Sequence, residues 1–310
     1  MNTMTDDSAT ILQLVLLPVP AHYQVPPDLP IAVRTDPAAT LDWLARRGSQ
    51  VTVLITHSGH GVPDFIWPHV PNLRLIANVG AGLERIDLKQ AASKGVQVTS
   101  TADLIAEDVA DVAMAFALSL VRQLPAFEDF IRQGRWSREE AGNTHSVKGR
   151  RLGIFGLGRI GLAVSKRAAP FGFIVGYHNR SARKDVAAQY FPTLLELAQW
   201  AEVLVVSVPG GPATAHAVNA EVLAALGPDG VIVNVGRGSI IDESALLAAW
   251  KSKQIAGVGL DVFEHEPQVD PAFLEAGNVL VSPHLASSTI ESGIAMADAV
   301  YQAARGVMSQ

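Results

Sequence analysis

The chain has 310 residues, enough to bury a sizeable core, and this length favours two domains over one. Its 48% hydrophobic and 17% charged residues are typical of a folded globular protein and exclude a disordered chain. The net charge of −6, with no basic stripe, argues against nucleic acid as a partner. Because cysteine is absent from the sequence, disulfides, thiolate metal sites and a cysteine nucleophile are excluded.

The first apolar run, Ile11–Leu17, follows ten polar residues that we expect to be frayed. The run is too short to span a bilayer, and Asp6 and Asp7 precede it where a signal peptide would be basic. We therefore predict a buried strand here, no membrane partner and a cytoplasmic protein.

The first hundred residues contain several short apolar runs with helix-compatible stretches between them, such as Pro37–Gly48 and Leu83–Gly95. Runs that are continuously apolar, rather than alternating, indicate a parallel sheet covered on both faces. This part of the chain is therefore predicted to form a small α/β domain. The predicted strands are Ile11–Leu17, Ile31–Thr35, Val51–Thr56, Leu73–Val79 and Val96–Ser100.

A long helix is predicted over Asp103–Leu124, because apolar residues such as Val109, Ala113 and Leu120 recur there at helical spacing. Asp103 could cap this helix, and Pro125 follows its end. The next segment, residues 126–148, is charged and shows little periodicity around Trp136. It could be an arm or subunit contact, and a solvated loop is an equally good interpretation.

From Gly149 onward, six apolar runs alternate with helical stretches such as Thr193–Trp200, Asn219–Leu226 and Glu243–Lys251. This alternation predicts a doubly wound parallel sheet, in which ligands bind beyond the carboxyl ends of the strands. The predicted strands are Arg151–Phe155, Phe173–Tyr177, Val203–Val208, Val231–Val235, Val258–Val262 and Val279–Ser282.

A glycine motif, Gly156-Leu-Gly-Arg-Ile-Gly161, lies between the first of these strands and the following helix. In this position the motif predicts dinucleotide binding. We expect Gly156 to form the tight turn, Gly158 to admit the pyrophosphate and Gly161 to let the helix approach the strand, while the helix N-terminus attracts phosphate. The alternative is a plain glycine-rich turn between strand and helix.

The second strand of this domain ends in Asn179-Arg-Ser181, with Arg183 just beyond. An NAD site usually has an acidic residue here, for the ribose hydroxyls. A guanidinium without that carboxylate suits a 2′-phosphate instead, so we predict a preference for NADPH over NADH. If Arg180 is merely a surface charge, the protein does not discriminate between NADPH and NADH.

Three reactive side chains follow neighbouring strands: Arg237, Glu266 and His284. Arg237 lies between two glycines and can bind a carboxylate through two hydrogen bonds. His284 can give a proton to a carbonyl oxygen, and an ionised Glu266 beside it favours the charged imidazolium. Together they suit reduction of a 2-oxo acid. Taken singly, each could be a loop charge, a solvated carboxylate or a packing residue.

The histidines outside this set, including His57, His60 and His265, are interpreted as structural or surface groups. His57 and His60 follow a strand of the small domain, but their spacing does not make a metal site. We predict no metal.

Four motifs, in this order, resemble those of the D-isomer-specific 2-hydroxyacid dehydrogenases, and more narrowly the NADPH-dependent glyoxylate/hydroxypyruvate reductases. The resemblance covers nearly the whole chain. The motifs are Gly156-Leu-Gly-Arg-Ile-Gly161, Asn234-Val-Gly-Arg-Gly-Ser-Ile-Ile-Asp-Glu243, Gly259-Leu-Asp-Val-Phe-Glu-His-Glu-Pro267 and Ser282-Pro-His-Leu-Ala286.

The resemblance implies a set of functional residues. Arg237, Glu266 and His284 match the catalytic residues, and Asp261 matches the residue that holds the nicotinamide carboxamide. Ala81 and Gly82, in a loop resembling the family's carboxylate-binding loop, join Arg237 and His284 as substrate-binding residues. The expected cofactor-binding residues are Gly156, Leu157, Gly158, Arg159, Ile160, Gly161, Asn179, Arg180, Ser181, Val208, Pro209, Val235, Arg237, Asp261, His284 and Ala286.

The resemblance also implies two doubly wound domains with a cleft between them. A flavodoxin-like substrate domain (1–102 and 285–310) accompanies a Rossmann NAD(P)-binding domain (103–284), and members are usually homodimers. The tail after His284 is short, so the returning helix is expected to be minimal. His265 stands where proline is frequent, which we expect to be harmless. Glu266 argues against a formate dehydrogenase, which has glutamine there.

We therefore expect NADPH-dependent reduction of glyoxylate or hydroxypyruvate to a D-2-hydroxy acid. Alternatives are a reductase of bulkier acids such as phenylpyruvates, a phosphite dehydrogenase, and a non-catalytic nucleotide-sensing protein on the same fold.

Overall fold

The computed structural model describes residues 10–275 and 277–309. The chain divides into two compact units, one formed by residues 1–105 with 287–310 and the other by residues 106–286. Except for Thr10, the N-terminal residues expected to fray lie outside the described part.

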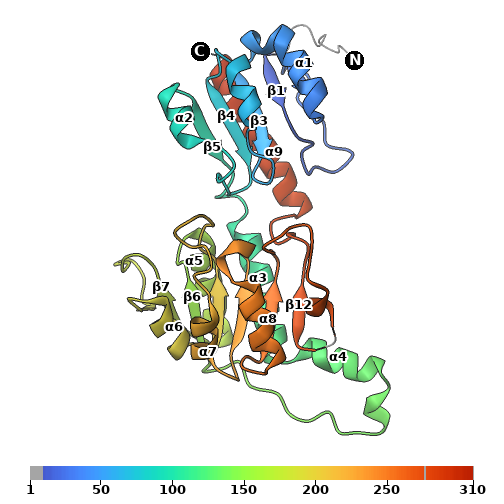
Figure 1. Cartoon of the computed structure of the whole chain (residues 1–310), viewed down its shortest axis with the longest axis vertical. Coiled ribbons are helices and arrows are strands. Elements are labelled where there is room, and N and C mark those ends of the chain that lie inside the picture. The colour runs from blue at the N-terminus through green and yellow to red at the C-terminus, as the bar shows by residue number, and fades with distance from the viewer. Residues whose placement is uncertain (1–9, 276, 310) are drawn as a thin grey trace. The chain divides into compact units, whose positions relative to one another are not determined.

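The first unit is built on a parallel sheet with the strand order β2-β1-β3-β4-β5 (Figure 1). This is the flavodoxin-like order of doubly wound sheets. Each predicted strand is present but shorter than its apolar run, because the ends of the runs continue into loops. The strands are β1 (Ile11–Gln13), β2 (Ile31–Val33), β3 (Val53–His57), β4 (Leu75–Val79) and β5 (Gln97–Ser100).

Helices cover both faces of this sheet. Helix α1 (Pro37–Arg47), capped by Asp36, packs Trp43 and Leu44 on one face, which α2 (Leu88–Ser93) also covers. The other face is covered by α9 (Ile290–Met308), seen in red behind β3 and β4 in Figure 1. The expectation of a minimal returning helix is therefore wrong. Helix α9 extends over 19 residues because an apolar stripe along it completes the core of this unit.

The second unit contains a longer parallel sheet, with the order β12-β11-β10-β9-β6-β7-β8. Read from the β8 edge, its first six strands in chain order have the classic Rossmann order 3-2-1-4-5-6, and β12 is added as a seventh strand at the opposite edge. The sequence did not indicate β8, which has two residues and little apolar surface. The strands are β6 (Arg151–Phe155), β7 (Ile174–His178), β8 (Gln189–Tyr190), β9 (Val203–Val206), β10 (Val231–Asn234), β11 (Gly257–Leu260) and β12 (Val279–Val281).

Two groups of helices enclose this sheet. Helices α3 and α5 bury their apolar sides on one face, and α6, α7 and α8 bury theirs on the other. Three of the helix starts have side-chain caps, from Thr193, Asn219 and Asp242. The helices are α3 (Ala106–Val121), α5 (Arg159–Ala168), α6 (Leu194–Trp200), α7 (Ala220–Leu226) and α8 (Glu243–Lys251).

The segment expected to be irregular begins with a helix, α4 (Leu124–Arg132). Pro125 therefore does not follow a helix end but lies in the first turn of α4, where proline is well tolerated. No single helix in the described part of the chain is long and apolar enough to cross a membrane. Helices α3 and α4 meet these criteria when taken together, across a bend of 61°.

Candidate active site

The glycine turn joins β6 to α5 and is shaped by two close approaches. Gly156 has φ +103°, and a Cβ on it would lie 2.8 Å from the backbone nitrogen of Val208. A Cβ on Gly161 would lie 2.3 Å from the carbonyl oxygen of Gly156. The turn and the helix therefore pack as expected of a nucleotide-binding motif. At Gly158, by contrast, a Cβ would meet nothing within 4 Å, so open space adjoins the start of α5.

A cavity of about 780 Å³ adjoins this turn, at the carboxyl ends of β6, β7 and β9. Its size, its many backbone amides and its place at a helix N-terminus fit a dinucleotide. Of the predicted cofactor residues, it is lined by Gly156, Leu157, Gly158, Asn179, Arg180, Ser181, Val208 and Pro209. The others, Arg159, Ile160, Gly161, Val235, Arg237, Asp261, His284 and Ala286, are not among its lining residues.

The segment after β7 is bonded to the glycine turn. Asn179 Oδ1 accepts a hydrogen bond from the N–H of Leu157 at 2.7 Å. Arg183 Nη1 donates to the carbonyl of Leu157 at 2.9 Å, and the same guanidinium pairs with Asp185. Both arginines line the cavity, and Arg183 also supports the turn through its bond to Leu157. This difference between two neighbouring arginines is not visible in the sequence.

The loop that carries Arg237 is folded by Asn234, at the end of β10. Asn234 is buried, its Nδ2 donates to the carbonyl of Arg237 at 2.9 Å, and its Oδ1 accepts from Gly236 N–H at 3.0 Å. Gly238 lies against the backbone of Phe263, in the loop after β11. The Arg237 loop and the Glu266 loop are thus in direct backbone contact.

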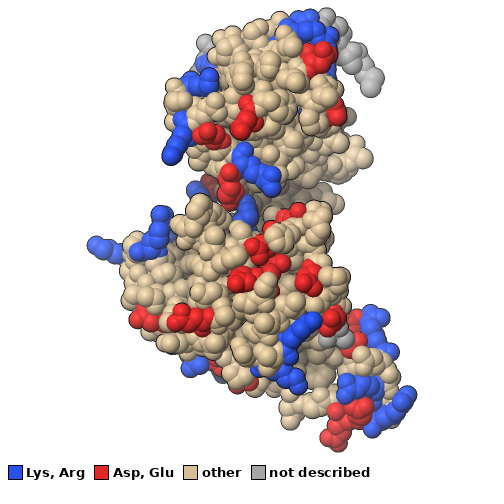
Figure 2. Space-filling model, viewed as in Figure 1, with Lys and Arg blue, Asp and Glu red and all other residues tan. Residues whose placement is uncertain are grey.

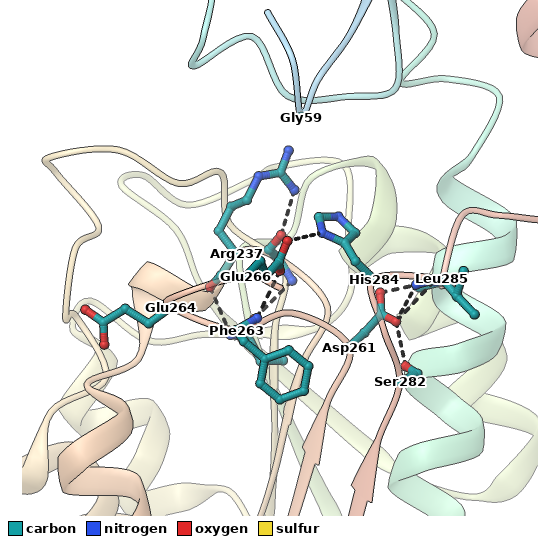
Figure 3. Close-up of polar contacts among 12 residues, drawn as sticks. Gly59, Arg237, Asp261, Phe263, Glu264, Glu266, Ser282, His284 and Leu285 are labelled. Carbon is teal, nitrogen blue, oxygen red and sulfur yellow. Dashed lines mark hydrogen bonds and ion pairs between the residues drawn. The ribbon is translucent and has the colours of Figure 1, made fainter. Parts of the chain in front are cut away.

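Arg237, Glu266 and His284 lie together above the ends of β10, β11 and β12, which are neighbours in the sheet (Figure 3). Glu266 Oε2 lies 2.9 Å from Nδ1 of His284, and Glu266 Oε1 accepts from Phe263 N–H at 3.0 Å. The structure therefore brings the three predicted catalytic side chains to one place. Because an ionised carboxylate only accepts hydrogen bonds, Nδ1 of His284 carries a proton and Nε2 faces away from Glu266.

The pKa of Glu266 is lowered. Partial burial raises it, but this effect is outweighed by the hydrogen bonds from His284 and Phe263 and by the charge of Arg237. Glu266 is therefore ionised at neutral pH, as its partnership with His284 requires.

Asp261 holds the turn that carries His284. Its buried carboxylate accepts from the Ser282 hydroxyl at 2.6 Å and from the N–H groups of Leu285 and Ala286 at 2.8 and 3.1 Å (Figure 3). His284 itself has φ +54°, a left-handed conformation that costs about 1–2 kcal/mol for a residue other than glycine. The bonds to Asp261 offset this cost and fix the imidazole.

Sequence reasoning did not assign roles to Asn234 and Ser282, although both lie in its motifs. A polar residue at the end of a buried strand, such as Asn234, is a signal that could have been used.

The remaining predicted residues lie in the first unit. Ala81 and Gly82 follow β4, in a loop ordered by Asn78, whose Nδ2 donates to the carbonyl of Gly82 at 3.0 Å. His57 Nδ1 accepts from the N–H groups of Gly59 and His60, and burial lowers its pKa. Among the described residues, no three His, Asp or Glu side chains are arranged to hold a metal ion.

Known proteins share this combination of folds and motifs. Residues 114–286 match the family model "D-isomer specific 2-hydroxyacid dehydrogenase, NAD binding domain". The chain belongs to this family, and its second unit contains the NAD(P)-binding domain.

Among its relatives are a 2-ketogluconate reductase of Gluconobacter oxydans (39% identical; 85% of each chain) and a glyoxylate/hydroxypyruvate reductase A of Arabidopsis thaliana (38% identical; 81% of this chain and 80% of the relative). A solved structure with a TM-score of 0.83 is the NADPH-dependent glyoxylate/hydroxypyruvate reductase of Sinorhizobium meliloti in complex with NADP and malonate. It is 37% identical, over 98% of this chain and 94% of that one.

Proposed function

We propose that the protein reduces small 2-oxo acids, such as glyoxylate and hydroxypyruvate, to D-2-hydroxy acids with NADPH. The observation that carries the proposal is the Glu266–His284 pair beside Arg237, at the strand ends of an NAD(P)-binding domain. Relatives named for glyoxylate, hydroxypyruvate and 2-ketogluconate all act on 2-oxo acids, which supports the substrate class.

In this mechanism, bound NADPH supplies the hydride, and the residues of the chain supply orientation, charge and a proton. The glycine turn and the N-terminus of α5 hold the pyrophosphate, and Asn179, Arg180 and Ser181 hold the adenosine end. Arg237 binds the substrate carboxylate and polarises the carbonyl to be reduced. His284 gives its Nε2 proton to the carbonyl oxygen as that oxygen becomes negative, while Glu266 stabilises the protonated imidazole.

The substrate carboxylate also needs donors, and we assign them to the Ala81 and Gly82 backbone in the first unit. That unit, residues 1–102 with 285–310 by the sequence motifs, is the substrate domain in this proposal. An N–H pair in a glycine-containing loop is a suitable anion site.

The experiment is a panel of acids assayed for NADPH oxidation by the purified protein. Glyoxylate and hydroxypyruvate are expected to have higher kcat/KM than phenylpyruvate.

A second candidate function is the reduction of larger 2-oxo acids, because a 2-ketogluconate reductase and a hydroxyphenylpyruvate reductase are relatives at 39% and 38% identity. A higher kcat/KM for phenylpyruvate than for glyoxylate and hydroxypyruvate would favour this second candidate. Turnover of phosphite with NADP⁺ would point to the phosphite alternative, and no turnover with any acid would favour a nucleotide-sensing protein.

The coenzyme preference depends on Arg180. Because a hydrogen bond to a charged group contributes about 1.5–3 kcal/mol, Arg180→Ala is expected to raise KM for NADPH by about 10- to 100-fold and to leave KM for NADH nearly unchanged. The measurement is steady-state kinetics with both coenzymes. Lys184→Ala, an exposed cation of the same loop that does not line the cavity, is the matched control. A wild-type preference for NADH would contradict this proposal.

Glu266 sets the pH range of the reaction. Its carboxylate is ionised above a lowered pKa, so its support for the His284 imidazolium is present at neutral pH and is lost as the pH falls through that pKa. In Glu266→Gln this support is absent at every pH. The alkaline limb of the kcat/KM profile, which reports loss of the proton donor, is therefore expected to move to lower pH. An unchanged alkaline limb would show that Glu266 does not act on His284.

We also propose a homodimer, formed partly through the segment that includes α4 and Trp136. Leu124, Ile131 and Trp136 are 54%, 56% and 69% exposed there, a concentration of apolar surface that a second copy would cover. Figure 2 shows charges of both signs on the same arm, which include the pairs Arg132–Glu128 and Arg135–Glu139. Sedimentation of the wild type and of Trp136→Ser measures the association.

A further inference from the structure

His216 lies in the loop after β9, whose neighbouring residues Thr214 and Ala217 line the nucleotide cavity. It has φ +50°, a left-handed conformation that is unfavourable for any residue with a Cβ, unless its surroundings hold it. Nothing in the mechanism above uses this histidine. Its contacts show what holds it.

Two bonds join His216 to the two catalytic loops. Its Nε2 lies 2.6 Å from Oε1 of Glu264, which is two residues before Glu266. Its backbone N–H donates to the carbonyl of Ser239 at 2.9 Å, in the 3-10 turn directly after Arg237. One residue therefore links a wall of the nucleotide cavity to the loop of Glu266 and to the loop of Arg237.

Glu264 is itself anchored. Its backbone N–H donates to Oε1 of Glu243, the first residue of α8, at 2.5 Å. Its side chain is 23% exposed and that of His216 is 50% exposed, so their bond lies at the edge of the protein and is not deeply buried. An exposed ion pair of this kind contributes little to global stability. The contribution expected of it is local, in the placement of the loop between Asp261 and Glu266.

The charged groups that face His216 are Glu264 and Asp242, from the loop after β11 and from the N-terminus of α8. The hydrogen bond to Glu264 and the negative charges of both groups raise the pKa of His216. The protonated form is thus favoured, and it strengthens the bond to Glu264 through charge assistance.

We propose that His216 is a positioning residue, which through Glu264 holds the Glu266 loop in a fixed position relative to the nucleotide cavity. The proposal rests on the function proposed above for Arg237, Glu266 and His284. It assigns to His216 no contact with the reacting atoms. Its consequence is that the orientation of the proton-donor pair depends on a residue of the cavity wall.

The test compares His216→Asn with His216→Gln. Asparagine tolerates the left-handed backbone but is too short to reach Glu264, whereas the amide nitrogen of glutamine can replace Nε2. His216→Asn is expected to lower kcat with glyoxylate about tenfold, because a small misplacement of a catalytic group is costly. KM for NADPH is expected to stay within about twofold, since the cavity wall is retained. Glutamine is expected to recover most of kcat.

Glu264→Gln with His216→Asn completes a double-mutant cycle, and the double variant is expected to be no slower than the slower single one. Lys251→Ala is the matched control, since Lys251 forms an exposed pair with Glu275 at 3.7 Å in the same unit. A kcat within twofold of wild type in His216→Asn, or no recovery with glutamine, would overturn the proposal.

Hydrogen exchange separates this proposal from the proposed function, because it needs no turnover. Amides of residues 261–266 are expected to exchange faster in His216→Asn than in the wild type or in Lys251→Ala. If the wild type reduces no 2-oxo acid, the proposed function fails, and this exchange alone decides whether His216 holds the loop. Equal exchange in all three proteins would overturn that role.

Discussion

The variant His284→Gln is expected to reduce glyoxylate with a kcat about 10²- to 10⁴-fold below that of the wild type, which is the range that general acid catalysis contributes. The glutamine amide can still form a hydrogen bond to Glu266, but it is not an acid at neutral pH and cannot protonate the carbonyl oxygen. Its KM for NADPH is expected to change little, because His284 does not line the cavity at the glycine turn. Single-turnover rates at saturating NADPH measure the chemical step directly.

Leu285→Ala is the control for this variant. Leu285 lies in the same turn, its side chain is 53% exposed, and the contact that the turn needs is its backbone N–H to Asp261. The control is therefore expected to keep the turn and the rate. If His284→Gln were as fast as Leu285→Ala, the proton would have to come from another group, and the mechanism proposed here would be wrong.

The central strands of the two sheets could be predicted because they are buried on both faces. A strand such as β10 (Val231–Asn234) is a continuous apolar run, and the same run identifies it in the sequence. The predicted strand ends were less accurate, because apolar residues such as Val235 and Val208 lie beyond the last hydrogen-bonded residues of their strands, in the loops that form the site. Strand β8 has no such run. Helix α4 was not predicted because its charged residues, Glu128, Asp129 and Arg132, interrupt the apolar periodicity of a short helix.

The meeting of the three proposed catalytic residues could be predicted because parallel strands present their carboxyl ends at one edge, so three distant segments come together there. The contacts that support them could not be predicted, although Asp261 itself lies in one of the motifs. Asp261 fixes the His284 turn through backbone amides 24 and 25 positions away, and His216 reaches Glu264 across 48 positions. Such contacts depend on side-chain geometry between segments, which no local pattern encodes.

Replacement of Gly238 by alanine is expected to disable the site although it adds a single methyl group. A Cβ at this position would lie 1.8 Å from the backbone carbon of Phe263 and 2.0 Å from its carbonyl oxygen. These are main-chain atoms of the loop that carries Glu266, and they cannot turn aside as a flexible side chain can. The Arg237 loop and the Glu266 loop must therefore separate.

We expect Gly238→Ala to lose about 2 kcal/mol or more of folding free energy, within or above the usual cost of overpacking. A shift of about 1 Å between Arg237 and Glu266 is expected to lower kcat/KM for glyoxylate by about 100-fold or more. Urea unfolding and steady-state kinetics measure the two effects separately. NADPH binding, followed by fluorescence, is expected to be much less affected, since Gly238 does not line the cavity.

Gly306→Ala provides the comparison for this substitution. Gly306 lies in α9, and a Cβ there would meet nothing within 4 Å. Alanine at this position is expected to stabilise the helix by about 0.5–1 kcal/mol and to leave the kinetics unchanged. If Gly238→Ala unfolded at the same urea concentration as the wild type and kept its kcat/KM, the two loops would not depend on this contact. The close approach at Gly238 would then have no part in aligning Arg237 with Glu266.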